Sequence, residues 1–292
     1  MKTAVMTDSN SGITKEEADR VGIFLLPMPV IIDEQTYYEG INLEQRFFYE
    51  SLIEGHDVST SQPSPGDVMD MWKQILSKGY DEIIHIPMSS GLSSSCATAI
   101  GLAEDFQGKV QVADNHRISV TMRIAVMEAL HMANEGRSAR EIREDLEKRA
   151  YDSSIFLAVD DLKYLKKGGR ITPAAAALGT VFHIKPVLTI HGEKLDAFAK
   201  ARGMKKAKAI MLKALKEDLE KRFPEIDPKY VRIGAAGAGL SPEESREWQA
   251  MLQEMFPEVQ VYYDHLSFSV SSHTGPGVYG MGFSIVQDPS IG

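Results

Sequence analysis

The sequence predicts an α/β protein built from two domains, and three observations lead to this prediction. The chain has 292 residues, more than one domain usually contains. Over its first half, short apolar segments alternate with segments of helical spacing, which is typical of a mainly parallel sheet flanked by helices. After about residue 153 the pattern changes to hairpins mixed with helices. We therefore expect an N-terminal α/β domain over residues 1–153 and a C-terminal α+β domain with a mixed sheet over residues 154–292.

In the first domain, short apolar runs bounded by charged or turn-forming residues predict strands. These runs are residues 3–7, 24–32, 82–86 and 109–113. Pro27 and Pro29 interrupt the second of them. Helices are predicted where a Ser or Thr cap precedes an acidic residue, or where apolar residues recur at helical spacing. They are expected after Thr14, over residues 43–53, 67–77, 96–103 and 118–134, and from Ser138 to about residue 150.

In the second domain, the same signals predict further strands at residues 155–159, 231–235, 259–263 and 282–286. Residues 185–190 and 194–200 should form a hairpin that turns at His191 and Gly192. Helices are expected at residues 161–167, in the small-residue run 174–182 that Thr172 and Pro173 open, over the basic stretch 202–222, and after Ser241.

Composition and charge exclude several classes of protein. The formal net charge of −9 argues against a general binder of nucleic acids or anionic membranes. Cys96 is the single cysteine, so neither an intrachain disulfide nor a multi-cysteine metal site can form within one chain. The N-terminus lacks a signal-peptide pattern, and no apolar run approaches the roughly 20 residues that span a bilayer. We therefore expect a soluble cytoplasmic protein without stable membrane insertion.

The stretch PMSSGLSSS at residues 87–95 is the first candidate binding site. It connects a predicted buried strand to a predicted helix, and the N-terminus of a helix attracts phosphate or carboxylate groups. Ligands in parallel sheets gather at the carboxyl ends of the strands, where Asp8-Ser9 and Thr60-Ser61 are also expected. The alternative is an ordinary turn whose serines only cap the helix.

Several catalytic signatures are absent from the sequence. It contains no P-loop, no H-E-x-x-H motif and no G-x-S-x-G elbow. Residues 275–280 match G-x-G-x-x-G literally, but only twelve residues follow, too few for a dinucleotide-binding unit, so we interpret them as a tight turn. What remains is a set of polar residues suited to an anion: Thr60, Ser93, Arg170, Arg202 and His273.

Six short motifs occur in order along the chain. They are TSQPS at Thr60–Ser64, SSGLS at Ser89–Ser93, LKKGGRIT at Leu165–Thr172, IKPVL at Ile184–Leu188, KAR at Lys200–Arg202 and HTGPG at His273–Gly277. On these motifs the chain resembles the DegV family, the fatty-acid-binding subunits that present acyl chains to a separate fatty acid kinase. Two departures from the family pattern are Ser94-Ser95, where Gly-Thr is usual, and Asp114-Asn115, where Asp-Ser is common.

The resemblance implies a long-chain fatty acid buried between two domains, with no cofactor and no metal. By this resemblance, Thr60 and Ser93 should bind the fatty acid carboxylate, with His273 beside it. Arg202 and His273 should assist phosphoryl transfer, and Arg170 should mark the surface that meets the ATP-binding kinase subunit. The protein would then be a lipid-binding partner in phospholipid metabolism and not an enzyme on its own.

Several apolar residues could line the acyl tunnel, and the alternative for each of them is ordinary packing in the hydrophobic core. The candidates are Met28, Ile32, Ala174–Ala177, Val181, Phe182 and Phe268. The basic run Lys200, Arg202, Lys205, Lys206 and Lys208 could form the docking face or a solvated helix surface.

Two other functions remain open at this point. One is a stand-alone serine hydrolase that uses Ser93 and His273, although no carboxylate is obviously placed to orient the histidine. The other is a regulatory protein that acts through its basic helix.

Overall fold

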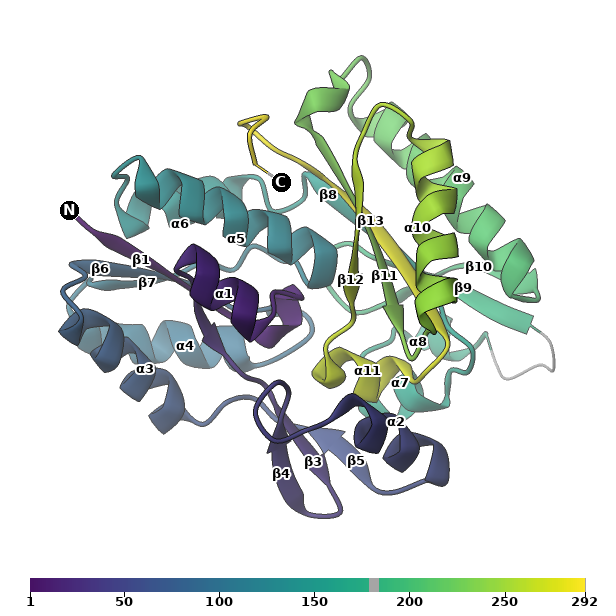
Figure 1. Ribbon diagram of the computed structural model, residues 1–292, viewed down its shortest axis with the longest axis horizontal. Coiled ribbons are helices and arrows are strands. Elements are labelled where there is room, and N and C mark those ends of the chain that lie inside the picture. The colour runs from purple at the N-terminus through teal and green to yellow at the C-terminus, as the bar shows by residue number, and fades with distance from the viewer. Residues whose placement is uncertain (179–183, 292) are drawn as a thin grey trace.

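The computed structural model describes residues 1–178 and 184–291, and it contains three β-sheets (Figure 1). The first sheet is parallel, in the order β2 (Phe24–Leu26), β1 (Thr3–Asp8), β6 (Glu82–Ile86) and β7 (Val110–Val112). Helices α3 (Pro65–Ser77) and α4 (Ser95–Ala103) cover one face of it. Helices α1 (Lys15–Val21), α5 (Ser119–Asn134) and α6 (Ala139–Lys148) cover the other face. The predicted parallel sheet with flanking helices is confirmed.

A small antiparallel sheet extends from this part of the chain. It consists of β4 (Gln35–Tyr38), β3 (Pro29–Ile32) and β5 (Val58–Thr60), and α2 (Gln45–Glu54) packs against it. The extended segment expected at residues 24–32 is therefore two strands in two different sheets, separated at Pro27. Strand β4 has no counterpart in the sequence prediction, because four partly exposed residues give little apolar signal.

The third sheet is mixed, as the sequence predicts for the C-terminal part. Its strands are β10 (Asp196–Arg202), β9 (Ile184–Ile190), β8 (Ser153–Ala158), β13 (Val278–Ile285), β11 (Val231–Ala238) and β12 (Val261–His265), in that spatial order. Only the β11–β12 pair is parallel among these strands. Strand β8 begins at Ser153, and a domain boundary at that residue stays a prediction.

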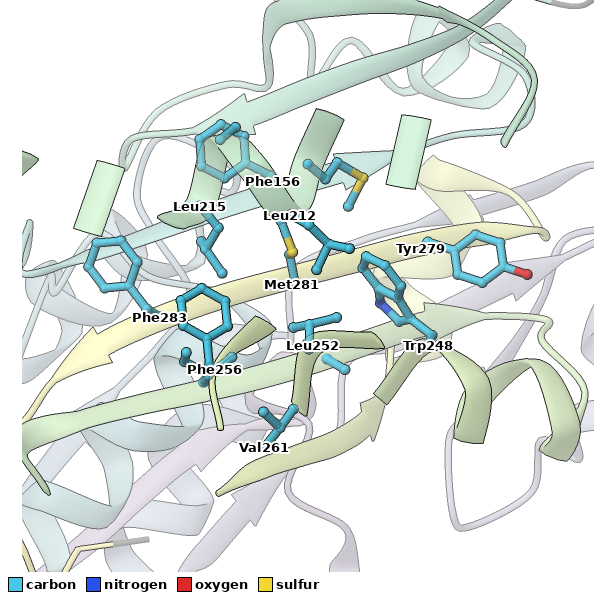
Figure 2. Packing of buried hydrophobic residues seen from close by; sticks show 14 of the residues in the cluster. Phe156, Leu212, Leu215, Trp248, Leu252, Phe256, Val261, Tyr279, Met281 and Phe283 are labelled. Carbon is cyan, nitrogen blue, oxygen red and sulfur yellow. The ribbon is translucent and has the colours of Figure 1, made fainter. Parts of the chain in front are cut away.

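Helices α9 (Met204–Arg222) and α10 (Pro242–Met255) cover one face of the mixed sheet. Figure 2 shows the hydrophobic core between these two helices and the sheet, which we call the outer core. It contains Phe156, Leu215, Trp248 and Phe283. Each of these side chains is at most 3% exposed, and burying one such side chain contributes about 1.5–3 kcal/mol. The indole N–H of Trp248 also donates to the carbonyl oxygen of Gly280, at 2.8 Å. Packing of α9 and α10 on this face stabilises the sheet.

The opposite face of the mixed sheet packs against α5, α7 (Lys163–Gly168), α8 (Pro173–Ala176) and α11 (Phe268–Thr274). We call this cluster the inner core; it includes Ile118, Leu157, Leu188 and Val278. Helix α5 belongs to both halves of the molecule, because its first turns pack on the mixed sheet and its later turns on the parallel sheet. Short 3-10 turns occupy Ser9–Ser11, Glu104–Phe106 and Pro228–Tyr230.

Most predicted caps are confirmed. The side chains of Thr14, Ser64, Ser138 and Ser241 each accept a backbone N–H at a helix start. Glu17 does not complete the capping box of Thr14, because its carboxylate pairs with Arg123 on α5. The small-residue helix expected over residues 174–182 is the short α8, capped by Thr172. Val181 and Phe182 lie outside the described residues.

The turn after α11 requires a glycine at position 275. Gly275 has a φ angle of +77°, in the left-handed region that residues other than glycine rarely adopt. A Cβ atom there would also overlap the ring of Tyr164. The backbone N–H of Gly275 donates to the Ser271 carbonyl at 2.8 Å, which ends α11.

We expect Gly275→Ala to lower the free energy of unfolding by about 1–3 kcal/mol, because it adds backbone strain and a steric overlap. Urea denaturation measures this change. Gly101→Ala is the matched control, since Gly101 lies in α4 with open space around it, and its stability should stay equal or rise slightly. Equal stability of both variants would contradict the assignment.

Candidate functional site

A cavity lies on the inner face of the mixed sheet. Its volume is about 90 Å³, several times the roughly 10–15 Å³ that one buried water needs. Its wall is formed by the sheet, the first turn of α5, helix α11, the segment after β6 and the end of β5. Most of this wall is hydrocarbon. The apolar residues are Met28, Met88, Leu92, Ile118, Val120, Ile155, Leu157, Leu165, Ile190, Leu195, Ala236, Leu266, Val270 and Met281.

Three polar side chains of the wall, those of Thr60, Arg170 and His273, lie close together, and we call them the polar cluster. The hydroxyl of Thr60 and Nε2 of His273 are 2.7 Å apart. Arg170 donates to the Gly168 carbonyl and, from Nε, to the Leu92 carbonyl at 3.4 Å. Gly168 lies against His273, because a Cβ atom there would overlap the imidazole. These residues are half-buried while most of the apolar wall is buried, so the cluster lies where the cavity opens.

The charge of the wall has one sign. Among the described residues that line the cavity, Arg170 is the only one with a permanent charge, and none is a carboxylate. Burial, and secondarily the positive charge of Arg170, lowers the pKa of His273 to about 4. The imidazole is therefore neutral at neutral pH and acts through hydrogen bonds. With the proton on Nε2, His273 donates to Thr60 and leaves the hydroxyl hydrogen of Thr60 free for a ligand.

Ser93 both supports α4 and faces the cavity. Its hydroxyl accepts from the backbone N–H of Ser95 at 3.2 Å, whereas Ser94 makes no side-chain cap bond. The segment before it is held from the other side, because the hydroxyl of Ser89 donates to the Gly192 carbonyl in the β9–β10 turn. A Cβ atom on Gly91 would lie 2.7 Å from that same carbonyl oxygen. The β9–β10 turn thus fixes the position of Ser93.

Asp8 and Ser9, which the sequence places at the same sheet edge, support the cavity from behind. The Asp8 carboxylate accepts from the backbone N–H groups of Met88 and Asn10, each at 2.8 Å. The Ser9 hydroxyl accepts from the N–H of Met28 at 3.0 Å. Burial raises the pKa of Asp8 to about 6. Both side chains therefore position wall residues and do not line the cavity themselves.

Four of the five polar residues singled out from the sequence come together in the wall, namely Thr60, Ser93, Arg170 and His273. Arg202 lies outside it, exposed at the end of edge strand β10. Side chains alternate along a strand, and Ala201 belongs to the outer core. Arg202 and Lys200 therefore project from the face of the sheet that carries the cavity.

The basic run does not form one continuous surface. Lys208 lies on α9, with Nζ 3.6 Å from the centre of the Tyr279 ring. Helix α9 covers the outer core, which is the opposite face from Lys200 and Arg202. The run is therefore divided between two faces of the mixed sheet.

The apolar candidates are only partly right. Met28 lines the cavity. Ile32 and Phe268 instead pack in the core of the small sheet, where Phe268 stacks on Phe48 with ring centres 4.6 Å apart. Ala175 is buried in the inner core, and none of residues 174–177 lines the cavity. An apolar residue has the same sequence signal whether it faces a core or a cavity, so sequence reasoning could not separate them.

Sequence reasoning also missed Gln62, Ser269 and Thr274, which line the cavity. Gln62 receives a hydrogen bond from Thr98 on α4 at 3.1 Å. Ser269 and Thr274 lie on α11, a helix that was not predicted. The available signal was Ser267, whose hydroxyl accepts from the N–H of Val270 as an N-cap.

Helix α11 is positioned by the small sheet. The backbone N–H of Phe268 donates to the carboxyl of Glu39 at 2.8 Å, and the Tyr49 hydroxyl lies 3.3 Å from the Ser271 hydroxyl. Burial raises the pKa of Glu39 to about 7, against the hydrogen bond from Phe268, which lowers it. Glu39 thus links the β4 segment to the helix that carries His273.

The geometry does not favour a serine hydrolase. His273 bonds to Thr60 and not to Ser93, and no carboxylate among the described lining residues could orient its ring. Within the described ranges, no group of three or more His, Cys, Asp or Glu side chains could hold a metal ion. None of the helices that the structure describes is long and apolar enough to cross a membrane.

Comparisons with known proteins agree with this architecture. The family model described as "Uncharacterised protein, DegV family" matches residues 2–286. A DegV domain-containing protein of Listeria innocua is 31% identical over 286 residues, covering 97% of this chain and 99% of the relative. A solved DegV family protein from Thermus thermophilus, described by its fatty acid binding, is 29% identical with a TM-score of 0.87, covering 98% of this chain and 100% of that one. DegV of Bacillus subtilis, solved as a fatty acid binding protein, is 28% identical with a TM-score of 0.83, covering 98% and 99%.

We expect Glu39 to contribute stability that is lost between about pH 4.5 and 7, and Glu39→Gln to remove this part of the pH dependence. A raised folded-state pKa means that the folded protein holds a proton which the unfolded chain has already lost. Ionisation of Glu39 should then remove on the order of 3 kcal/mol of stability as pH rises. Urea denaturation across this pH range measures the effect.

Glu44→Gln is the control for this experiment, because Glu44 is exposed at the start of α2 and makes no cap bond. The pH dependence of Glu44→Gln should equal that of wild type. Glu39→Gln should keep the part that other buried groups cause, since burial raises the pKa of Asp8 to about 6 and of Asp264 to about 7 and lowers that of His273 to about 4. An unchanged slope in Glu39→Gln would show that the carboxyl does not carry the effect.

Proposed function

Since the chain belongs to the DegV family, we propose that it binds a long-chain fatty acid in the cavity and presents the carboxylate to a separate kinase subunit for phosphorylation to an acyl phosphate. The observation that carries the proposal is the composition of the wall. Among the described residues it is mostly hydrocarbon, and its one permanent charge is the cation of Arg170 in the polar cluster. A ligand that matches this wall is apolar along its length and bears one negative charge at one end.

The head group would be recognised at the polar cluster. The hydroxyls of Thr60 and Ser93 can donate to a carboxylate, and Arg170 offers a charge-assisted hydrogen bond. A charged group taken out of water needs such a partner, because an unpaired buried charge is costly. In this arrangement Arg170 contacts the ligand directly. We also propose that Arg170 lies at the surface that meets the kinase subunit, and only the resemblance to the family supports that second role.

The acyl chain would supply most of the affinity. Each methylene that leaves water contributes about 0.8 kcal/mol, so a chain of about fifteen contributes on the order of 10 kcal/mol. The polar cluster then determines the orientation of the ligand more than its affinity. The relatives from Thermus thermophilus and Bacillus subtilis, described as fatty acid binding, support this choice of ligand.

In the proposed reaction a carboxylate oxygen attacks the γ-phosphorus of ATP held by the partner. The bond from that phosphorus to the β-phosphate bridging oxygen breaks, so that ADP leaves and an acyl phosphate forms. Arg202, exposed on the cavity side of β10, would stabilise the negative charge of the transferring group when the partner docks. His273, neutral before the ligand binds, would hold Thr60 and the carboxylate in position. The use of ATP fits the cytoplasmic location expected from the sequence.

We expect Thr60→Ala combined with Ser93→Ala to weaken fatty acid binding by at least about tenfold, because two hydrogen bonds to a charged group are lost. Titration of delipidated protein with palmitic acid measures the dissociation constant. Thr36→Ala with Ser90→Ala is the matched control, since both hydroxyls are exposed and neither residue lines the cavity. Equal affinity in the two double variants would contradict the head-group assignment. Turnover of p-nitrophenyl esters by the wild-type protein would favour the hydrolase instead.

We expect Arg202→Ala to retain bound fatty acid but to lose most acyl phosphate formation, because Arg202 lies outside the cavity wall, is exposed, and would face the proposed partner. The assay combines the protein, a fatty acid kinase subunit and labelled ATP, and lipid content is measured separately by mass spectrometry. Lys206→Ala, at an exposed position of α9, is the control for loss of one positive charge. Wild-type turnover in Arg202→Ala would refute this role.

A further inference from the structure

The inner strands of the mixed sheet contain several glycines, and most of them are required by packing. A Cβ atom on Gly234 of β11 would lie 2.6 Å from Cβ of Val120. One on Gly282 of β13 would lie 2.6 Å from the Ser154 carbonyl oxygen. Real Cβ atoms do not approach other heavy atoms so closely. At these two positions the protein itself occupies the space beside the backbone.

Gly280 of β13 is different. A Cβ atom there would meet Cβ of Ala236 at 3.5 Å and Cβ of Leu157 at 4.0 Å, which is ordinary van der Waals contact. Its φ angle also lies outside the left-handed region, so the backbone does not call for glycine. Neither packing nor conformation explains the missing side chain. Gly280 does line the cavity.

Gly280 forms the centre of a shallow depression in the cavity floor. Strand pairing aligns it with Leu157 of β8 on one side and with Ala236 of β11 on the other. Leu157 and Ala236 also line the cavity. On the opposite face the strand is held in place by the hydrogen bond from Trp248 to the Gly280 carbonyl. The floor therefore cannot easily shift to make room, and its depth depends on the side chains at positions 236 and 280.

We propose that Gly280, together with Ala236, determines how long an acyl chain the cavity accepts, an inference that rests on the proposed function. A side chain at position 280 would project into the space that the chain needs. The wall on the side of α5 is already fixed, because Val120 packs directly on Gly234. Carbon atoms added at the floor must therefore displace carbon atoms of the ligand.

The test is competition among fatty acids in delipidated protein. Wild type, Gly280→Ala and Gly280→Val are each incubated with an equimolar mixture of lauric, myristic, palmitic and stearic acids, and the bound acids are quantified by mass spectrometry. In Gly280→Val, the ratio of the two shorter to the two longer acids should rise about tenfold, as expected when one or two methylenes lose their place in the cavity. Gly280→Ala should shift the ratio in the same direction by less.

Gly101→Val is the matched control, since Gly101 has open space around it in α4 and does not line the cavity; its ratio should equal that of wild type. If wild type binds fatty acids and Gly280→Val binds the shorter and longer acids in the wild-type ratio, this inference is wrong while the proposed function stands. Failure of Gly280→Ala and Gly280→Val to fold would also overturn it, because packing would then require the glycine. A wild type that binds none of the four acids overturns the proposed function and this inference with it.

Discussion

The approach of helix α5 to the mixed sheet is the constraint on which the cavity depends. Where α5 touches the sheet, Val120 packs on Gly234, and the methyl of Thr121 would lie 3.1 Å from a Cβ atom on Gly282. Glycine at these positions lets a helix approach closer than ordinary side chains permit. Two residues further along each strand, at Gly280 and Ala236, this close packing gives way to the cavity. Small residues thus allow close packing of α5 on the sheet at one position and leave space for the cavity at the next.

The polar end of the cavity is assembled from segments that are far apart in the chain, so its geometry depends on what holds each segment. Buried carboxyls do much of this through backbone N–H groups: Asp8 holds the segment at Met88, and Glu39 holds the start of α11. Both carboxyls are placed behind the wall and not in it. This separation matters because a carboxylate in the wall would repel an anionic head group. The carboxyl groups thus belong to the scaffold, while the wall keeps one positive charge.

Sequence reasoning recovered most elements because their signals are local. Strands and caps such as Ser138 with Glu141 depend on neighbours in the chain, and the structure contains them. Helix α11 was missed because its stability comes from distant partners, Glu39 and the stacked ring of Phe48. Motifs identified the polar residues of the wall but not their arrangement. Whether Arg170 or Arg202 lines the cavity depends on strand register and on a bulge in β10, neither of which is written in a motif.

Burial is the main cause that lowers the pKa of His273, and the positive charge of Arg170 adds to it. A guanidinium is a cation in almost any surroundings, whereas the imidazole of His273 is neutral at neutral pH. A wall with two cations would have to bury excess positive charge whenever it is empty, which is unfavourable. With one cation and one neutral imidazole, the site matches a single carboxylate. An arriving anion would offset the field of Arg170 and make a proton on His273 less costly, so the hydrogen bonding of the cluster would change when an anion binds.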